Sequence, residues 1–217
     1  QYYGVSLPFW RSYDKEDPRR EFFYYDYTGD AKRDDQSDYG FHYMVPEEGV
    51  TVVPNDTTKY MQNVATMKYT YDMISDAYYD GRTICIFRLS DVILCKAEIE
   101  NNLNGPAAAL PYLNQIRARA GAPEYGKHNR FPAPSTKEAM NDAILKERGY
   151  ELVFEFQRRA DLIRFGKYEE VVNAHLKKLG IAQPTNVTSS LRYFPYPLND
   201  AQLNPNLAAE NPSRLPK

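Results

Sequence analysis

The pattern of apolar and polar residues becomes helical at Arg88. From there, apolar side chains recur at intervals of three and four residues, which is the period of an amphipathic helix. The sequence NNLNG then predicts the end of this helix, because Asn and Gly favour C-terminal caps. We expect one apolar stripe along residues 88–103, formed by Leu89, Val92, Ile93, Ala97, Ile99 and Leu103.

A second helix is predicted to follow directly, over residues 106–120. Pro106 opens it, since a proline in the first turn gives up no helical hydrogen bond, and Gly121 closes it. Its apolar stripe comprises Leu110, Leu113, Ile116 and Ala120. The two helices make an antiparallel hairpin with the length of one tetratricopeptide unit. One unit cannot bury its own apolar face, so further helices are expected, either in missing sequence or in a partner.

Three more helices are predicted nearer the carboxy-terminal end, over residues 136–154, 157–165 and 168–179. Gly166 and Gly180 end the last two. The remaining tail is rich in prolines and is predicted to be extended, without a further helix. The buried face of the first of these helices is expected to consist of Ile144, Leu145, Leu152, Val153 and Phe156.

Before Arg88 the helical period is missing, and turn-forming sequences such as KEDPRR, YTGDAKRDDQSDYG and VPNDTT take over. Short apolar pieces such as GVTVV and TICIF are typical of strands between turns. We therefore predict a mainly α fold with tetratricopeptide-like helical hairpins. Residues 1–84 are expected to form a loop-rich, tyrosine-rich region with short strands, and residues 85–217 a helical scaffold. Both are expected to be parts of one larger domain whose amino-terminal portion is absent from this chain.

Composition separates the same two regions. The 217-residue chain holds 19 Tyr, and 13 of them lie in residues 1–85. Those residues carry 9 Lys and Arg against 15 Asp and Glu, whereas residues 86–217 carry 18 against 14. A formal net charge of −2 leaves no basic surface of the kind that nucleic acids require, which argues against nucleic acid as a partner.

A row of carboxylates makes the strongest case for catalysis. Glu147, Glu151 and Glu155 stand four residues apart, which places them on one face of a helix. Glycoside hydrolysis needs two carboxylates on either side of a sugar bond, about 5–10 Å apart, whereas a helical row presents its groups from one side. The arginines among them can hold the carboxylates ionised, which does not suit a general acid. We interpret the row as a packing element, and we predict no enzyme activity and no cofactor.

Metal and disulfide chemistry find little support. The acidic loop offers Asp30, Asp34 and Asp38 as calcium candidates, but the spacing misses the EF-hand pattern and a solvated loop is expected instead. Cys85 and Cys95 lack the spacing of zinc ligands, Cys95 is interpreted as a small core residue, and a disulfide between the two stays open. No apolar run reaches the length of a transmembrane helix, and no signal peptide is recognised.

Aromatic residues beside Asp, Asn and Arg are the remaining candidates for function. A tyrosine presents a flat apolar face with a polar tip, which suits stacking on a sugar ring while polar neighbours bind its hydroxyl groups. The same composition suits a peptide groove or a protein interface. The candidate ligand-binding residues are Trp10, Arg11, Tyr24, Tyr25, Tyr27, Tyr78 and Tyr79.

Three separate blocks of the sequence resemble a known family. The blocks RLSDVILCKAEIENNL…ALPYLNQIRARAG, AILKERGYELVFEFQRRADLIRFGK and FPYPLNDAQLNPNL follow one another over residues 88–210, and their order and spacing resemble the carboxy-terminal part of the SusD/RagB family. The earlier sequence DPRR, residues 17–20, also fits this family. The chain departs from the family pattern at Phe156 and Gln157, where Gly and His are common, and at Gly149 and Ala160, where bulkier residues are common.

The resemblance implies a mainly helical fold with long irregular insertions and no catalysis. Members of this family bind glycans, or in some cases peptides, at the surface of Bacteroidetes, where they cover a SusC-like TonB-dependent outer-membrane transporter. The chain is therefore expected to be a carboxy-terminal fragment of a lipoprotein of the outer membrane, with the lipid anchor missing. Glycan binding is the leading hypothesis. Peptide binding on the same scaffold, and a helical scaffold that only binds proteins, stay open as alternatives, as do the identity of the ligand and the oligomeric state.

Overall fold

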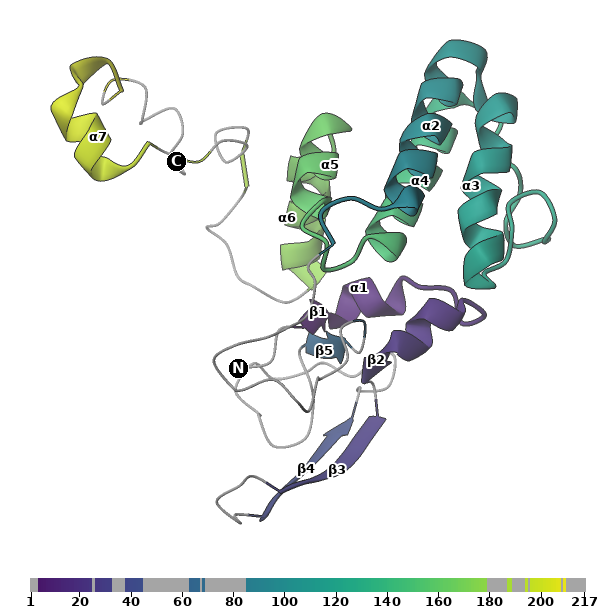
Figure 1. The fold of residues 1–217 in the computed structure, drawn as a ribbon, viewed down its shortest axis with the longest axis horizontal. Helices are drawn as coiled ribbons and strands as arrows, with labels where there is room; N and C mark the ends of the chain where they lie inside the picture. The colour runs from purple at the N-terminus through teal and green to yellow at the C-terminus, as the bar shows by residue number, and fades with distance from the viewer. Residues whose placement is uncertain are drawn as a thin grey trace. The chain divides into compact units, whose positions relative to one another are not determined.

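The computed structural model describes residues 4–24, 26–32, 38–44, 63–66, 68, 85–178, 187–188, 194, 196–207 and 209. These residues form mostly helices with a few short strands, as Figure 1 shows. The mainly α fold predicted from the sequence is thereby confirmed. The chain divides into two compact units, Gln1–Lys137 and Glu138–Lys217. The change of composition near residue 85 falls inside the first unit, so it does not mark the boundary between them.

The first unit contains a small antiparallel sheet of three short strands. β1 (Gly4–Ser6) and β2 (Phe23–Tyr24) both pair with β5 (Asn63–Thr66), which gives the strand order β1-β5-β2. Between β1 and β2 the chain forms α1 (Leu7–Arg11) and a 3-10 helix, η1 (Pro18–Phe22). The sheet thus brings together segments that are about forty to sixty residues apart in the sequence.

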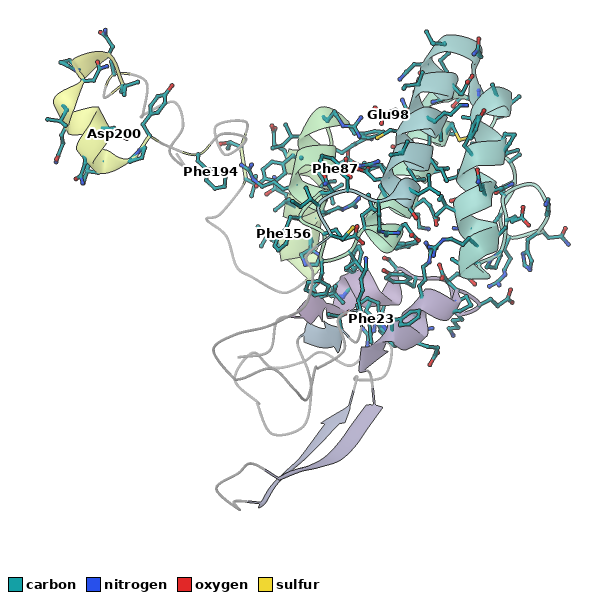
Figure 2. All side chains as sticks on the ribbon, in the orientation of Figure 1. Phe23, Phe87, Glu98, Phe156, Phe194 and Asp200 are labelled. Carbon is teal, nitrogen blue, oxygen red and sulfur yellow. The ribbon has the colours of Figure 1, made fainter. Side chains whose placement is uncertain are left out.

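An aromatic cluster forms the core beside this sheet. The ring of Tyr13 is buried, and its centroid lies 5.6 Å from that of Phe9, edge-on, and 5.6 Å from that of Phe23. Phe23 is itself buried and is labelled in Figure 2. Aromatic pairs in such geometries stabilise a core beyond the area that they bury. Part of the aromatic content of the front region therefore serves packing.

A two-stranded antiparallel hairpin lies between β2 and β5 in the sequence. It consists of β3 (Asp26–Lys32) and β4 (Asp38–Met44). The register runs from the pair Asp26 and Met44 to the pair Lys32 and Asp38 (Figure 1). Of the two strands named from the sequence, GVTVV lies outside the described residues. The described part of TICIF, residues 85–87, is not a strand, so that prediction was wrong there.

α2 (Leu89–Asn104) and α3 (Pro106–Ala120) form the predicted helical hairpin and lie side by side in Figure 1. The end of α3 depends on Gly121, which has a φ of 72° in the left-handed region that favours glycine. A Cβ atom on this residue would also lie 3.2 Å from Cγ of Pro18. This close approach of Pro18 places η1 against the end of α3.

The buried face of α2 differs from the predicted stripe. Ser90, Leu94, Ala97 and Asn101 are buried, and they repeat at intervals of four, three and four residues. Of the six stripe residues, the four that are exposed are Leu89, Val92, Ile99 and Leu103. The helix thus has two faces with helical period, and the more polar of the two packs inward. The prediction followed hydrophobicity alone, and it was right for Ala97, which is buried, but wrong for the four exposed residues.

The second unit begins within α4 (Lys137–Glu151) and continues with α5 (Arg158–Arg164) and α6 (Tyr168–Lys178). These three helices match the predicted ones, with boundaries that differ by up to three residues. α7 (Leu198–Leu203) was not predicted, and the expectation of a tail without a further helix was wrong. A helix of six residues is too short to show a helical period in the sequence.

α4 ends three residues before its predicted end because the chain turns sharply after Glu151. In that turn Phe154 and Phe156 have φ angles of 61° and 62°, in the left-handed region that a side chain rarely adopts. Phe156, which is labelled in Figure 2, is 85% exposed, so the prediction that it is buried was wrong.

Candidate ligand-binding site

Trp10, the first of the candidate ligand-binding residues, is a buried side chain. It is 5% exposed, and the guanidinium carbon of Arg20 lies 4.1 Å from the centroid of its ring. Its Nε1 donates a hydrogen bond of 3.4 Å to the backbone oxygen of Arg20. This environment gives Trp10 a packing role, and its role in ligand binding stays a prediction that its burial disfavours. Arg11, at the end of α1, is half-buried.

The DPRR segment forms the start of the 3-10 helix η1 and makes contacts within the first unit. The carboxylate of Asp17 is buried and accepts hydrogen bonds from the backbone N–H of Arg19 (3.0 Å) and from its guanidinium (2.7 and 3.0 Å). The hydrogen bond from the backbone N–H caps the first turn of η1, and the guanidinium forms a bidentate pair with the same carboxylate. Pro18 approaches Gly121, and Arg20 covers Trp10. Each residue of the motif therefore has a structural partner within the chain.

The tyrosine candidates lie partly within the described residues. Tyr24 is in β2, opposite Ala65 of β5. Tyr27 is in β3, opposite Tyr43 of β4. The structure thus places these two candidates on different sheets, although they are close in sequence. Their role in binding stays a prediction, and so does that of the candidates that lie outside the described residues, Tyr25, Tyr78 and Tyr79.

The calcium candidates lie on the same hairpin. Asp30 of β3 lies opposite Gly40 of β4, and Asp38 of β4 lies opposite Lys32 of β3. Asp34 lies outside the described residues. In the part of the chain where side chains are described, no group of three or more His, Cys, Asp or Glu residues is placed to hold a metal ion. Calcium binding in this loop stays a prediction, which the cation of Lys32 disfavours.

The glutamate row is almost fully buried. Glu147, Glu151 and Glu155 are 1%, 4% and 7% exposed. Only the first two stand on a helix, because α4 ends at Glu151 and Glu155 lies in the turn that follows. A glycosidase needs its two carboxylates open to a sugar chain. The burial of all three residues therefore supports their interpretation as packing elements.

The arginines around this row also bind groups that the sequence did not indicate. Arg148 and Asp161 form a buried ion pair between α4 and α5, with Nε 2.8 Å from Oδ2. Arg164 adds a contact of 3.1 Å to the other oxygen of Asp161. Arg158 donates a hydrogen bond of 2.7 Å from Nη1 to the backbone oxygen of Leu145. Charged groups thus join α4 to α5.

Gly149 belongs to the same assembly. A Cβ atom at this position would lie 2.8 Å from Nη1 of Arg158, closer than real Cβ atoms come to other heavy atoms. Glycine inside a helix normally costs stability. Here it makes room for the guanidinium that bonds to Leu145, which explains the departure from the bulkier residues noted at this position.

One arginine–aromatic cluster in the first unit escaped the sequence analysis. Arg117 is buried, and its guanidinium lies 4.8 Å from the ring centroids of both Tyr125 and Phe131. Asn114 holds the same loop, because its side-chain amide exchanges two hydrogen bonds of 2.9 Å with the backbone of Tyr125. The partners come from α3 and from the loop after it. No local pattern in the sequence reveals such a cluster.

A second such cluster lies in the second unit. The guanidinium carbon of Arg159 lies 4.4 Å from the ring centroid of Phe194 and 5.4 Å from that of Tyr168. Phe194, labelled in Figure 2, is exposed. Cation–π contacts at exposed sites are worth about 0.5–1 kcal/mol. This cluster therefore fixes the tail to α5 and α6 only weakly.

A family model described as the SusD family, which covers SusD and RagB, matches residues 7–213. The chain belongs to the SusD family. The resemblance noted in three blocks is thereby confirmed over nearly the whole chain. DPRR and the cluster around Arg148 and Asp161 both lie within the region that matches.

Two curated proteins are similar in sequence to this SusD-family chain. SusD-like protein P25 of Formosa agariphila is 39% identical over 120 residues, which are 55% of this chain and 22% of that protein. The starch-binding protein SusD of Bacteroides thetaiotaomicron is 28% identical over 137 residues, which are 62% of this chain and 22% of that protein. The chain thus spans about a fifth of the length of these relatives.

A solved structure agrees with this assignment. A SusD superfamily protein from Bacteroides vulgatus superposes on 91% of this chain with a TM-score of 0.57 and 25% sequence identity, and the match covers 40% of that protein. The SusD-family fold thus extends over both units of the chain. No helix in the described part of the chain is long and apolar enough to cross a membrane.

Proposed function

We propose that this protein binds glycans at the bacterial cell surface and delivers them to a SusC-like TonB-dependent outer-membrane transporter. One observation carries the proposal: the chain belongs to the SusD family, and one of its relatives is named for starch binding. The protein is proposed to reach the outer membrane through a lipid anchor in the intact polypeptide.

The proposed role is binding without catalysis. The best carboxylate candidates, Glu147, Glu151 and Glu155, are almost fully buried, which supports a structural role for them. If one of them were catalytic, the protein would release reducing sugar from a bound glycan and Glu151→Gln would abolish the release. We expect no release from the unsubstituted chain.

Electrophoresis in gels that contain dissolved polysaccharide tests glycan binding directly. We expect at least one neutral polysaccharide to retard the chain relative to a non-binding protein of similar size and charge. If no polysaccharide retards it, while oligopeptides bind it saturably, the peptide-binding alternative replaces the proposal. If neither class binds, the scaffold that acts only in protein interaction replaces it.

Delivery to a transporter is tested separately. The intact lipoprotein and a SusC-like transporter from the same genome are purified in detergent and mixed. We expect the two to elute together in size-exclusion chromatography. Separate elution at concentrations of tens of micromolar would contradict the proposed partner and would leave glycan binding standing.

A further inference from the structure

One side of α2 carries a row of exposed side chains that repeat with a regular spacing. We call Leu89, Val92, Lys96, Ile99 and Leu103 the outer stripe. Successive members stand three, four, three and four residues apart. This alternation is the spacing at which one helix packs along another, because it keeps every member on one side of the helix. The four apolar members are between 55% and 74% exposed, so a surface with the form of a helix–helix seam is open to solvent.

The outer stripe spans most of α2. From Leu89 to Leu103 it extends over about 21 Å of helix, which corresponds to about four turns of a partner helix. Ile86 and Phe87, directly before α2, are also exposed, and Figure 2 labels Phe87. Single exposed apolar residues are common on protein surfaces, whereas a contiguous apolar patch marks an interaction surface.

The outer stripe and the buried residues of α2 do not overlap. Ser90, Leu94, Ala97 and Asn101 are buried and belong to the other side of the helix, which pairs with α3 in the hairpin (Figure 1). In proteins built from stacked helical hairpins, a hairpin at the end of the stack has a polar outer face, and an inner hairpin has an apolar face that its neighbour covers. The outer stripe therefore indicates an inner hairpin, with a further helix against α2.

Lys96 argues against a second copy of this chain as the occupant. It is the middle member of the outer stripe. In a parallel pair of α2 helices in register, and in an antiparallel pair centred on the stripe, Lys96 meets the same residue of the second copy. Two ammonium groups in the middle of an apolar seam repel each other and lose their hydration. A helix of a different sequence avoids this repulsion.

The lengths of similar proteins point to the source of such a helix. The match to the solved SusD superfamily protein includes 91% of this chain but only 40% of that protein. The matches to the curated relatives likewise include about a fifth of their length. More than half of the solved protein therefore lies outside the region that corresponds to this chain.

We propose that the outer stripe of α2 is the docking surface for an amphipathic helix from the part of the intact polypeptide outside these 217 residues. The occupant lies along α2 for about four turns, and its own apolar stripe buries Leu89, Val92, Ile99 and Leu103. The surface has no part in ligand binding, so the proposal is independent of the glycan-binding function.

Labelling of single cysteines with a maleimide compares the 217-residue chain with the intact polypeptide. Both carry Cys85→Ser and Cys95→Ser, and any further cysteine of the intact polypeptide is replaced by serine. Ile99→Cys places the reactive thiol on the outer stripe. Gln115→Cys is the control, because it places the thiol at an exposed position of α3, the other helix of the hairpin. Circular dichroism checks that each variant keeps its helical content.

We expect both thiols to react readily in the 217-residue chain. In the intact polypeptide Ile99→Cys should react at least about tenfold more slowly, because the docked helix must move away first, and Gln115→Cys should react at an unchanged rate. Equal rates for Ile99→Cys in the two proteins would overturn the proposal. Equal slowing of both thiols would overturn it as well, since the protection would not belong to the outer stripe.

Leu103→Ala gives a second measurement, which needs no label. The thermal unfolding midpoint of the intact polypeptide should fall by about 5 °C, because the substitution removes a buried side chain there, and that of the 217-residue chain by no more than about 2 °C. Equal shifts in the two proteins would contradict docking at this surface. Slow labelling of Ile99→Cys in the 217-residue chain that becomes faster on dilution would show that a second copy covers the stripe, which overturns the proposed occupant.

Discussion

At the scale of single residues, the most informative positions are those where the side chain contradicts a local rule. Gly149 stands inside α4, where alanine normally stabilises a helix by about 1 kcal/mol relative to glycine. The guanidinium of Arg158 occupies the space that a Cβ atom would need. The rule is thus overridden by a contact between two helices that follow each other in the chain.

The substitution Gly149→Ala should therefore destabilise the protein by about 1–3 kcal/mol, opposite in sign to the helix propensity. The cause is displacement of Arg158 from its hydrogen bond with Leu145. Urea unfolding of the single variant and of Gly149→Ala combined with Arg158→Ala measures it. The second substitution should cost less in the combined variant than alone, because it also removes the clash. Additive costs would show that the two residues do not interact.

Phe156 breaks a second rule, since its φ of 62° suits glycine and its side chain is exposed. The left-handed conformation costs a residue with a side chain about 1–2 kcal/mol. Phe156→Gly should therefore raise the free energy of unfolding by up to about 1 kcal/mol, after the larger entropy of glycine in the unfolded chain is deducted.

Phe154→Gly is the control for this prediction. Its φ of 61° is the same, but its side chain is half-buried, so the loss of packing should outweigh the relief of strain. The thermal unfolding midpoint should rise for the first variant and fall for the second. A fall in both would show that the backbone at Phe156 carries no strain.

Single residues also show where sequence reasoning reached its limit. The pattern predicted the packing role of the glutamate row, but it did not predict that Arg148 binds Asp161, thirteen residues away on another helix. It named Trp10 as a candidate ligand contact, and it did not predict that Arg20 covers the ring. Local sequence shows which side chains are present, but it does not show which distant residues they contact in the fold.

At the scale of elements, α2 has two faces with helical period, and the sequence favoured the wrong one. The buried face of Ser90, Leu94, Ala97 and Asn101 is partly polar. Lys96 interrupts the exposed stripe and lies 4.7 Å from the ring centroid of Tyr112. The pKa of Lys96 is raised above its usual value, and the largest cause is its hydrogen bond with Tyr112.

Two substitutions of the same kind on α2 distinguish its faces. Leu94→Ala should cost about 2–5 kcal/mol of stability, because Leu94 is fully buried. Leu103→Ala should stay within about 0.5 kcal/mol of the unsubstituted chain, because Leu103 is 74% exposed. Chemical denaturation measures both. If Leu103→Ala costs as much as Leu94→Ala, the stripe predicted from the sequence is buried after all and the assignment of faces is wrong.

Helices and turns with strong local signals were predictable, and elements defined by distant partners were not. α3 begins at the predicted proline and ends before the predicted glycine, since both residues act locally. The three-stranded sheet joins β1 and β2 to β5, and no short window of sequence contains both sides of that pairing.

At the scale of the whole molecule, the chain belongs to the SusD family over nearly its full length. The match to the SusD family covers residues 7–213, and the structural neighbour covers 91% of the chain. The motifs that revealed the family, DPRR and the cluster from Glu147 to Arg164, bind other parts of the same chain and hold its short elements together. The resemblance therefore identified the scaffold, and the proposed ligand contacts lie where the family motifs do not reach.

The central claim is that this protein binds a glycan. Isothermal titration calorimetry of the 217-residue chain against soluble polysaccharides, with a mixture of oligopeptides titrated in parallel, tests it most directly. The account predicts a saturable heat with at least one neutral polysaccharide and none with the oligopeptides. A saturable heat with oligopeptides, and none with any polysaccharide, would contradict it.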